Sequence, residues 1–125
     1  MGLEEEKAPT FMQKPKLRQD EDEDIIFFEC VVAAYPKPEV VWYFNDKVIV
    51  ESKRLVPQIK ELSASRFYVG LKIYEPEDED SGLYKISLTN SKGNAIGSIF
   101  ANFKGENEKN IFSFFPFISS CDFLY

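Results

Sequence analysis

The chain has 125 residues, room for one domain of ordinary size, and its 44% content of apolar residues supports a hydrophobic core. Its 15 basic and 21 acidic residues give a net charge of −6, which argues against DNA or RNA as a partner because phosphate binding needs a positive face. There is no histidine, and the only cysteines are Cys30 and Cys121, which excludes Ser-His-Asp and Cys-His catalysis, His-ligated metal sites and four-cysteine zinc sites.

The chain opens with a charged leader, residues 1–7, which lacks the apolar stretch of a secretory signal peptide. No later segment approaches the roughly 20 consecutive apolar residues of a membrane helix, so no membrane association is expected. Pro9 favours an extended backbone at Ala8, which places the start of the first strand there. We therefore expect a non-catalytic domain, without cofactor or metal ion, that starts at residue 8.

Between residues 20 and 104 the sequence alternates between strand signals and turn signals. The strand signals are short segments rich in β-branched and aromatic residues, several with apolar side chains at every second position. They cover residues 25–32, 40–44, 66–73, 83–89 and 95–103, with weaker signals over 48–59 around Pro57. No segment keeps a helical period, and this many short strands predict an all-β sandwich or barrel.

A spaced pattern narrows the fold. Cys30 is followed twelve residues later by Trp42, and much later by the segment Asp80-Ser81-Gly82-Leu83-Tyr84. This pattern resembles the intermediate-set (I-set) immunoglobulin fold, a β-sandwich of two antiparallel sheets. The resemblance implies that Trp42 packs beside Cys30 and that the Tyr84 hydroxyl turns back to the chain at the preceding corner. In that turn Asp80 is expected to accept backbone N–H groups, and Gly82 to provide conformational freedom.

The chain departs from the immunoglobulin pattern at one position. Ile86 stands where the resemblance implies the second cysteine of the intersheet disulfide. We therefore expect no intersheet disulfide, a small buried thiol at Cys30, and a reducing compartment. The missing crosslink is typically worth about 2–4 kcal/mol, so the apolar core must suffice. The predicted structural core contains Cys30, Trp42, Leu71, Tyr84 and Ile86.

Short strings within the pattern narrow the family further. The segments 9–15, 28–30, 82–85 and 90–93 resemble modules of the titin/twitchin/projectin giant muscle proteins. The resemblance covers about residues 8–104 and leaves residues 105–125 as a polar linker and an aromatic tail. It implies a non-enzymatic spacer and filament-docking module of a cytoplasmic, sarcomeric protein. The implied partners are myosin, actin or neighbouring immunoglobulin and fibronectin modules, and the isolated domain is expected to be a monomer.

Three other hypotheses belong to different classes. A cell-adhesion or receptor domain would have an oxidised disulfide, a signal peptide and often glycans, and the sequence offers none of these marks. A regulatory module beside a kinase domain could be recognised only from the neighbouring sequence. An enzyme built on paired carboxylates would need a cleft that separates their pKa values, which exposed turns on a small sandwich do not provide.

Two acidic runs, residues 20–24 and 75–80, are expected to meet at one end of the sandwich, and we name them together the acidic pole. Three interpretations stay open: a docking surface for a basic partner, a weak calcium site, or a solvated end that keeps the module soluble. The EF-hand spacing of acidic residues is not met. The candidate interaction residues are Asp20, Glu21, Asp22, Glu23, Asp24, Glu77, Asp78 and Glu79.

The aromatic tail is unusual, because it carries six of the chain's 19 aromatic residues. Such a segment must be covered, bound or prone to aggregation. It is either a ligand that docks on a groove or adds a strand to a sheet edge, or an end with no specific role. The candidate residues are Phe114, Phe115 and Phe117.

Two remaining features have plain structural interpretations. Lys53, Arg54, Lys60 and Arg66 are scattered basic residues, which form either a faint basic face or an ordinary solvated surface. Gly70 interrupts an otherwise regular strand signal, which predicts a bulge or a close approach of another group.

Overall fold

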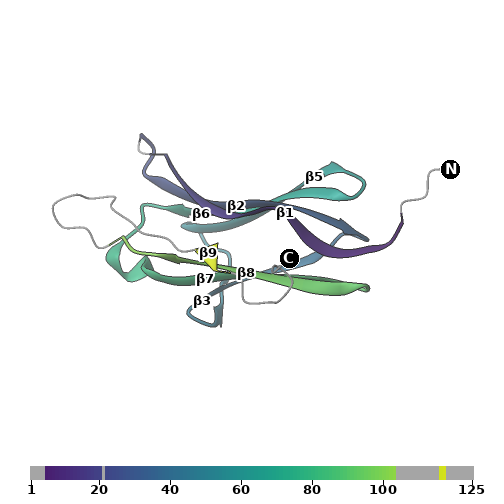
Figure 1. Ribbon diagram of the computed structural model, residues 1–125. Helices are drawn as coiled ribbons and strands as arrows, with labels where there is room; N and C mark the ends of the chain where they lie inside the picture. The colour runs from purple at the N-terminus through teal and green to yellow at the C-terminus, as the bar shows by residue number, and fades with distance from the viewer. Residues whose placement is uncertain (1–4, 21, 104–115, 118–125) are drawn as a thin grey trace.

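The structure is a computed structural model that describes residues 5–20, 22–103 and 116–117. Within these residues two antiparallel sheets pack face to face, so the predicted all-β immunoglobulin-like sandwich is confirmed (Figure 1). The first sheet has the order β1 (Lys7–Asp20), β2 (Ile25–Tyr35), β6 (Arg66–Tyr74), β5 (Leu55–Ser63). The second sheet has the order β4 (Lys47–Val48), β3 (Glu39–Phe44), β7 (Gly82–Asn90), β8 (Gly93–Ala101), β9 (Pro116–Phe117).

The core follows from period-two alternation in the strands. Along β2 every second side chain from Ile26 to Val32 is buried between the sheets, and the side chains between them are only partly covered. Tyr84 and Phe28 stack with ring centroids 4.5 Å apart, and Trp42 lies 6.4 Å from the Phe28 ring. The residues expected in the core are all buried in one cluster: Cys30, Trp42, Leu71, Tyr84 and Ile86.

The β5 strand differs most from the sequence expectation. Its weak signals suggested short pieces ending at Ile59, but β5 is a nine-residue strand that continues to Ser63. Its last five residues are exposed, so its own side chains do little to specify it. Backbone pairing with β6, from Leu55↔Ile73 to Ser63↔Arg66, defines the strand instead, and β5 forms a free edge of the first sheet.

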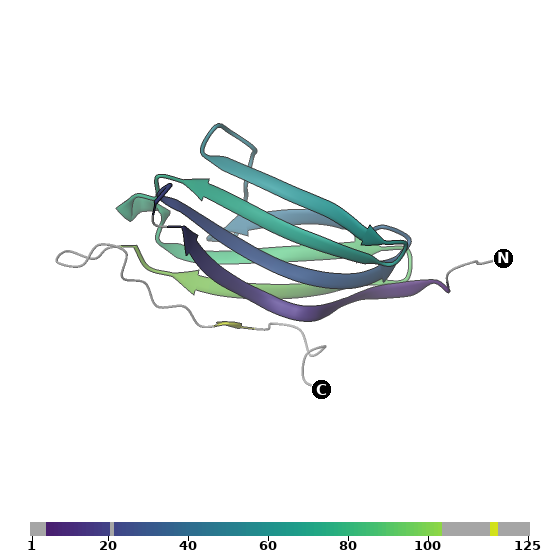
Figure 2. The ribbon, with the colours of Figure 1, turned by 90° about the horizontal axis from the view of Figure 1, so that it is seen from above.

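The first strand bridges the two sheets. β1 pairs with β2, but its register shifts three times, and it packs against β8 of the second sheet (Figure 2). The approach is close, because a Cβ atom at Gly97 would lie 2.9 Å from Cγ of Pro15. Glycine at this position therefore allows β1 to lie against the second sheet.

The chain enters and leaves the sandwich at opposite ends. Lys7, at the start of β1, pairs with Tyr35, while Ala101, at the end of β8, pairs with Gly82 at the other end (Figure 2). The described part of the chain contains one 3-10 turn, η1 (Asp78–Asp80), and no helix with the length and hydropathy of a membrane span.

Candidate functional site

The two acidic runs lie side by side at the end of the sandwich where β8 leaves. The N–H of Glu75 donates to the carbonyl oxygen of Asp24 at 2.8 Å, which joins the β1–β2 turn to the segment before β7. The N–H of Glu23 donates to Oδ1 of Asp20 at 3.2 Å and shapes the first turn. Asp20 is therefore partly engaged in its own turn.

Most acidic side chains of the pole face solvent. The exposed ones are Asp22, Glu23, Asp24, Glu75, Glu77, Asp78 and Glu79, while Glu21 lies outside the described residues. Over residues 5–20, 22–103 and 116–117, no three Asp, Glu, Cys or His side chains are arranged to hold a metal ion. The calcium interpretation therefore has no ligand set among the residues that the structure describes.

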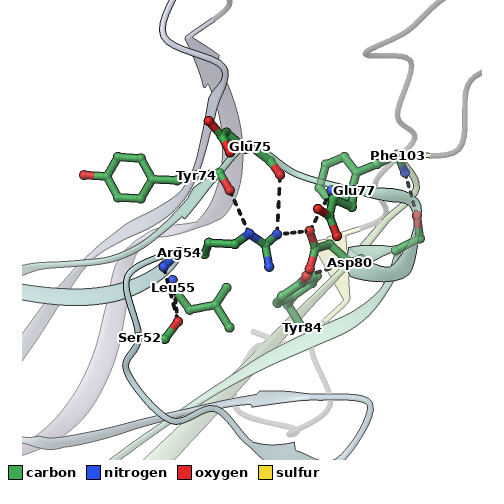
Figure 3. Close-up of polar contacts among 10 residues, drawn as sticks. Ser52, Arg54, Leu55, Tyr74, Glu75, Glu77, Asp80, Tyr84 and Phe103 are labelled. Atoms are coloured by element: carbon green, nitrogen blue, oxygen red, sulfur yellow. Dashed lines mark hydrogen bonds and ion pairs between the residues drawn. The ribbon is translucent and has the colours of Figure 1, made fainter.

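Asp80 has a different role from its acidic neighbours, because Arg54 binds it (Figure 3). Nη2 of Arg54 lies 2.5 Å from Oδ2 of Asp80, and the same guanidinium donates to the carbonyl oxygens of Tyr74 at 3.2 Å and Glu75 at 3.4 Å. The interaction fastens the start of β5 to the segment that enters β7. Arg54 is thus a structural anchor and not a free surface charge.

The corner before β7 has the arrangement expected from its sequence (Figure 3). Oδ2 of Asp80 accepts the N–H of Glu77 at 2.7 Å, and the Tyr84 hydroxyl donates to the carbonyl oxygen of Asp80 at 2.5 Å. Burial, and then the charge of Asp80, raise the pKa of Tyr84, so its hydroxyl stays protonated. These two hydrogen bonds fix the corner as a structural element.

Gly82 is required by a close contact at this corner. A Cβ atom there would lie 2.7 Å from Oδ1 of Asn45 and from Cε1 of Phe44. Asn45 itself exchanges hydrogen bonds with Leu83, since its N–H donates at 2.8 Å and its Oδ1 accepts at 2.9 Å. The sequence predicted an unusual dihedral angle at Gly82, and its φ of +158° confirms it. The space taken by Phe44 and Asn45 is a second constraint on this position.

The thiol of Cys30 is enclosed by the core. Cys30 is a free cysteine, 2% exposed, and Ile86 belongs to the same buried cluster. Burial raises the pKa of the Cys30 thiol to about 12. The side chain is therefore an uncharged apolar residue at neutral pH, without the thiolate that nucleophilic chemistry requires.

The aromatic tail meets the second sheet through its backbone. Pro116 and Phe117 pair with Ile99 and Ser98 and add β9 to the edge of β8. The candidate residues Phe114 and Phe115 lie outside the described residues, and of Phe117 only the backbone is described. Strand addition at a sheet edge is one of the two tail interpretations offered by the sequence.

An apolar groove opens between the edges of the two sheets, where β5 faces β3. It has a volume of about 210 Å³, and two prolines, Pro38 and Pro57, form part of its wall. Val40, Ile59, Lys37 and Gln58 complete the lining. The groove brings together residues of the loop between β2 and β3 and residues of β5, which gave only weak strand signals in the sequence. No sequence motif marks the groove, because these two segments are far apart in the chain.

Comparison with known proteins places this geometry in a family. The immunoglobulin I-set domain matches residues 9–100. Mouse Alpha-protein kinase 3 is 34% identical over 92 residues, which is 73% of this chain and 5% of that protein. The muscle M-line assembly protein unc-89 of Caenorhabditis elegans is 28% identical over 111 residues, 88% of this chain and 1% of that protein.

Solved structures agree with the sequence matches. The titin I-band fragment I67-I69 aligns with a TM-score of 0.61 and 26% identity, covering 74% of this chain and 31% of that one. A chain from the crystal structure of Dpr2 Ig1-Ig2 in complex with DIP-Theta Ig1-Ig3 gives a TM-score of 0.66 and 33% identity over 76% of this chain and 32% of that one. The kinase relatives match in their immunoglobulin part alone. The chain belongs to the immunoglobulin I-set family and resembles the immunoglobulin domains of titin-like muscle proteins.

Proposed function

We propose that this domain is a mechanical spacer and filament-docking unit of a giant cytoplasmic protein of the sarcomere. The observation that carries the proposal is that β1 begins and β8 ends at opposite ends of the sandwich. Such a domain adds its full length to a tandem array, because the strand axes lie along the direction of the chain. At about 3.4 Å per residue, the nine residues of β7 span about 30 Å.

Both ends of the sandwich are fastened by side-chain hydrogen bonds. At the entry end, Nδ2 of Asn90 donates to the carbonyl oxygens of Lys7 and Pro36, each at 2.9 Å. At the exit end, Oγ of Ser81 accepts the N–H of Phe103 at 2.8 Å. These contacts hold the start of β1 and the segment after β8 to the body of the domain, which suits a unit that transmits tension.

The relatives support a muscle setting for the proposal. Titin of Drosophila melanogaster is 31% identical over 88 residues, and human myotilin is 26% identical over 93 residues. A solved titin Z1Z2 structure is a complex with telethonin, which supports docking as a role of such modules. We infer from these relatives that the partners are other sarcomeric proteins, with myosin, actin and neighbouring modules as the first to test.

Cosedimentation with purified thick and thin filaments at physiological salt tests the docking role. Residues 1–125 and 1–104 are compared after the amide spectrum of each has shown a folded domain. We expect both forms to pellet with one filament type, which would locate docking on the sandwich. Pelleting of the longer form alone would assign docking to the tail, and no pelleting of either form would reject docking and leave a spacer.

A second candidate function is regulation of an adjacent kinase domain. It is favoured by the match to Alpha-protein kinase 3 and by the solved twitchin kinase region, which aligns with a TM-score of 0.60 and 25% identity. Sequencing of the parent transcript tests it directly. A kinase domain next to this module would favour regulation, and a run of further immunoglobulin or fibronectin modules would favour the spacer.

A further inference from the structure

The outer face of the first sheet gathers cations that are far apart in the sequence. The register aligns Arg18 of β1, Phe27 of β2 and Lys72 of β6 in one row across the strands. The next row aligns Lys16 with Glu29, and the rows beyond contain Lys60 and Arg66. On β2 and β6 the positions of these rows alternate with buried core residues, so the rows lie on the face that points away from the second sheet.

The outer face of the first sheet is positively charged, although the chain as a whole is negatively charged. Four strand rows, from Arg18 to Arg66, hold five cationic side chains and one carboxylate, that of Glu29, in a chain of net charge −6. We name this surface the basic face. Its cations are Lys16, Arg18, Lys60, Arg66 and Lys72.

The single carboxylate of the basic face is neutralised in place. Arg18 binds Glu29 through Nε at 2.7 Å and Nη2 at 3.3 Å, and the Tyr68 hydroxyl donates to the same carboxylate at 2.6 Å. A Cβ atom at Gly70 would lie 2.9 Å from that hydroxyl oxygen, so glycine gives the Tyr68 side chain room to reach Glu29. The remaining cations keep their positive potential.

Aromatic rings lie among the cations. The guanidinium carbon of Arg18 lies 4.0 Å from the centroid of the Phe27 ring, and Nζ of Lys72 lies 5.7 Å from the same ring and 5.9 Å from that of Tyr74. These contacts hold the long side chains over the sheet. A partner therefore meets cations in defined places beside apolar rings.

The basic face is not flat. β1 shifts register between Gln13 and Lys16, and beside this shift a hollow of about 100 Å³ opens between β1 and β2. Gln13, Lys16, Tyr68 and Val31 contribute to its wall. The hollow offers one partner side chain a seat next to the cation of Lys16.

We propose that the basic face is a docking surface for a short, extended, acidic segment of another protein. Charge complementarity selects an acidic partner. An extended segment suits an open four-stranded face, and a short one avoids the acidic pole at the end of the same sheet. Long polyanions would meet that pole and be repelled. The proposal goes beyond filament docking, since it holds whether or not the domain binds filaments.

The test uses the full chain, isotopically labelled, and a short polyglutamate peptide as the probe. We expect amide shifts on addition of the peptide to concentrate at the basic face, and affinity to fall as salt rises. Single-stranded oligothymidine and vesicles of phosphatidylserine with phosphatidylcholine serve as other anions. Stronger binding of either anion than of the peptide would overturn the assignment to an acidic protein segment.

A matched pair of triple variants distinguishes the effect of the basic face on peptide binding from the effect of net charge. The first combines Lys16→Glu, Lys60→Glu and Arg66→Glu, and we expect it to weaken peptide binding by about tenfold or more. The second combines Lys37→Glu, Lys47→Glu and Lys53→Glu, which are exposed, lie off the face and change the net charge equally. Equal losses in both variants would contradict the proposal.

Two checks keep the result interpretable. Glutamine at the same three positions of the face provides a milder set, for use if the glutamate variant does not fold. Sedimentation of the wild type without peptide tests a second copy as the occupant, with its acidic pole on the basic face. Self-association that the face variant abolishes would replace the proposed partner by this chain itself.

Discussion

The outer faces of the two sheets arise from the same alternation of side chains along the strands but differ in chemistry. The first presents cations around a neutralised Glu29. The second presents mostly apolar and hydroxyl side chains, with Val48 59% and Phe100 40% exposed, and its cation Lys85 is paired with Asp46 at 3.1 Å. On each face one ion pair neutralises a charge in place, Arg18 with Glu29 on the first and Lys85 with Asp46 on the second. Alternation determines which residues face outward, but their identity determines the kind of partner.

The interior that both sheets share should be the most sensitive region. We expect Trp42→Ala to lower the free energy of unfolding by about 3–5 kcal/mol, because Trp42 is 4% exposed and packs on Phe28. Urea denaturation measures the loss. Phe100→Ala, on the outer face of the second sheet, is the control and should change stability by about 0.5 kcal/mol or less. Comparable losses in the two variants would refute the assigned core.

The next largest effect is expected at the link between the sheets. Arg54→Ala removes the guanidinium that joins β5 to Asp80 and to two carbonyl oxygens, and should cost about 1–2 kcal/mol, since the pair is partly exposed. Lys53→Ala removes the exposed neighbouring cation and serves as the control in thermal unfolding. If the control loses as much stability as Arg54→Ala, the anchoring role is wrong.

A smaller, pH-dependent effect is expected on the outer face of the first sheet. Burial acts to raise the pKa of Glu29, but hydrogen bonds from Arg18 and Tyr68 outweigh it, and the pKa lies below its ordinary value of 4.5. The stability from this carboxylate is therefore complete above pH 4.5 and is lost as the pH falls below it. Glu29→Gln should cost about 1 kcal/mol at pH 7, and the difference should shrink in acid. A difference that is independent of pH would contradict this.

The smallest effect is expected from the thiol between the sheets. Adding reductant should leave the melting temperature unchanged, because Cys30 is a free thiol in the core. Alkylation of a Cys121→Ser variant should be slow while the domain is folded, since burial raises the pKa of Cys30 to about 12. A drop in melting temperature with reductant would instead show that Cys30 forms a disulfide.

The spacing of a few residues along the sequence was enough to predict most of the fold. Cys30, Trp42 and Tyr84 identified the sandwich because each has one structural environment in this fold, and the corner before β7 is encoded within a few residues. The anchoring role of Arg54 was not predicted, because its partner Asp80 lies 26 residues away. Nothing in the sequence distinguishes Arg54 from the other basic residues near it. A faint basic face with Lys60 and Arg66 was one of two interpretations of the sequence, but the contribution of Lys16, Arg18 and Lys72 was not predicted. It depends on the register of β1, β5 and β6, which no single strand encodes.

The free edge of β5 affects how readily domains that lie close together associate with one another. A proline fits an edge strand where its nitrogen faces away from the neighbouring strand, so at Pro57 the outer edge offers no N–H to another chain. Lys60 and Glu61 add exposed charges along the same edge. Copies held at high local concentration, as in a tandem array, would therefore resist pairing edge to edge, and a misfolded dimer of adjacent modules would be disfavoured.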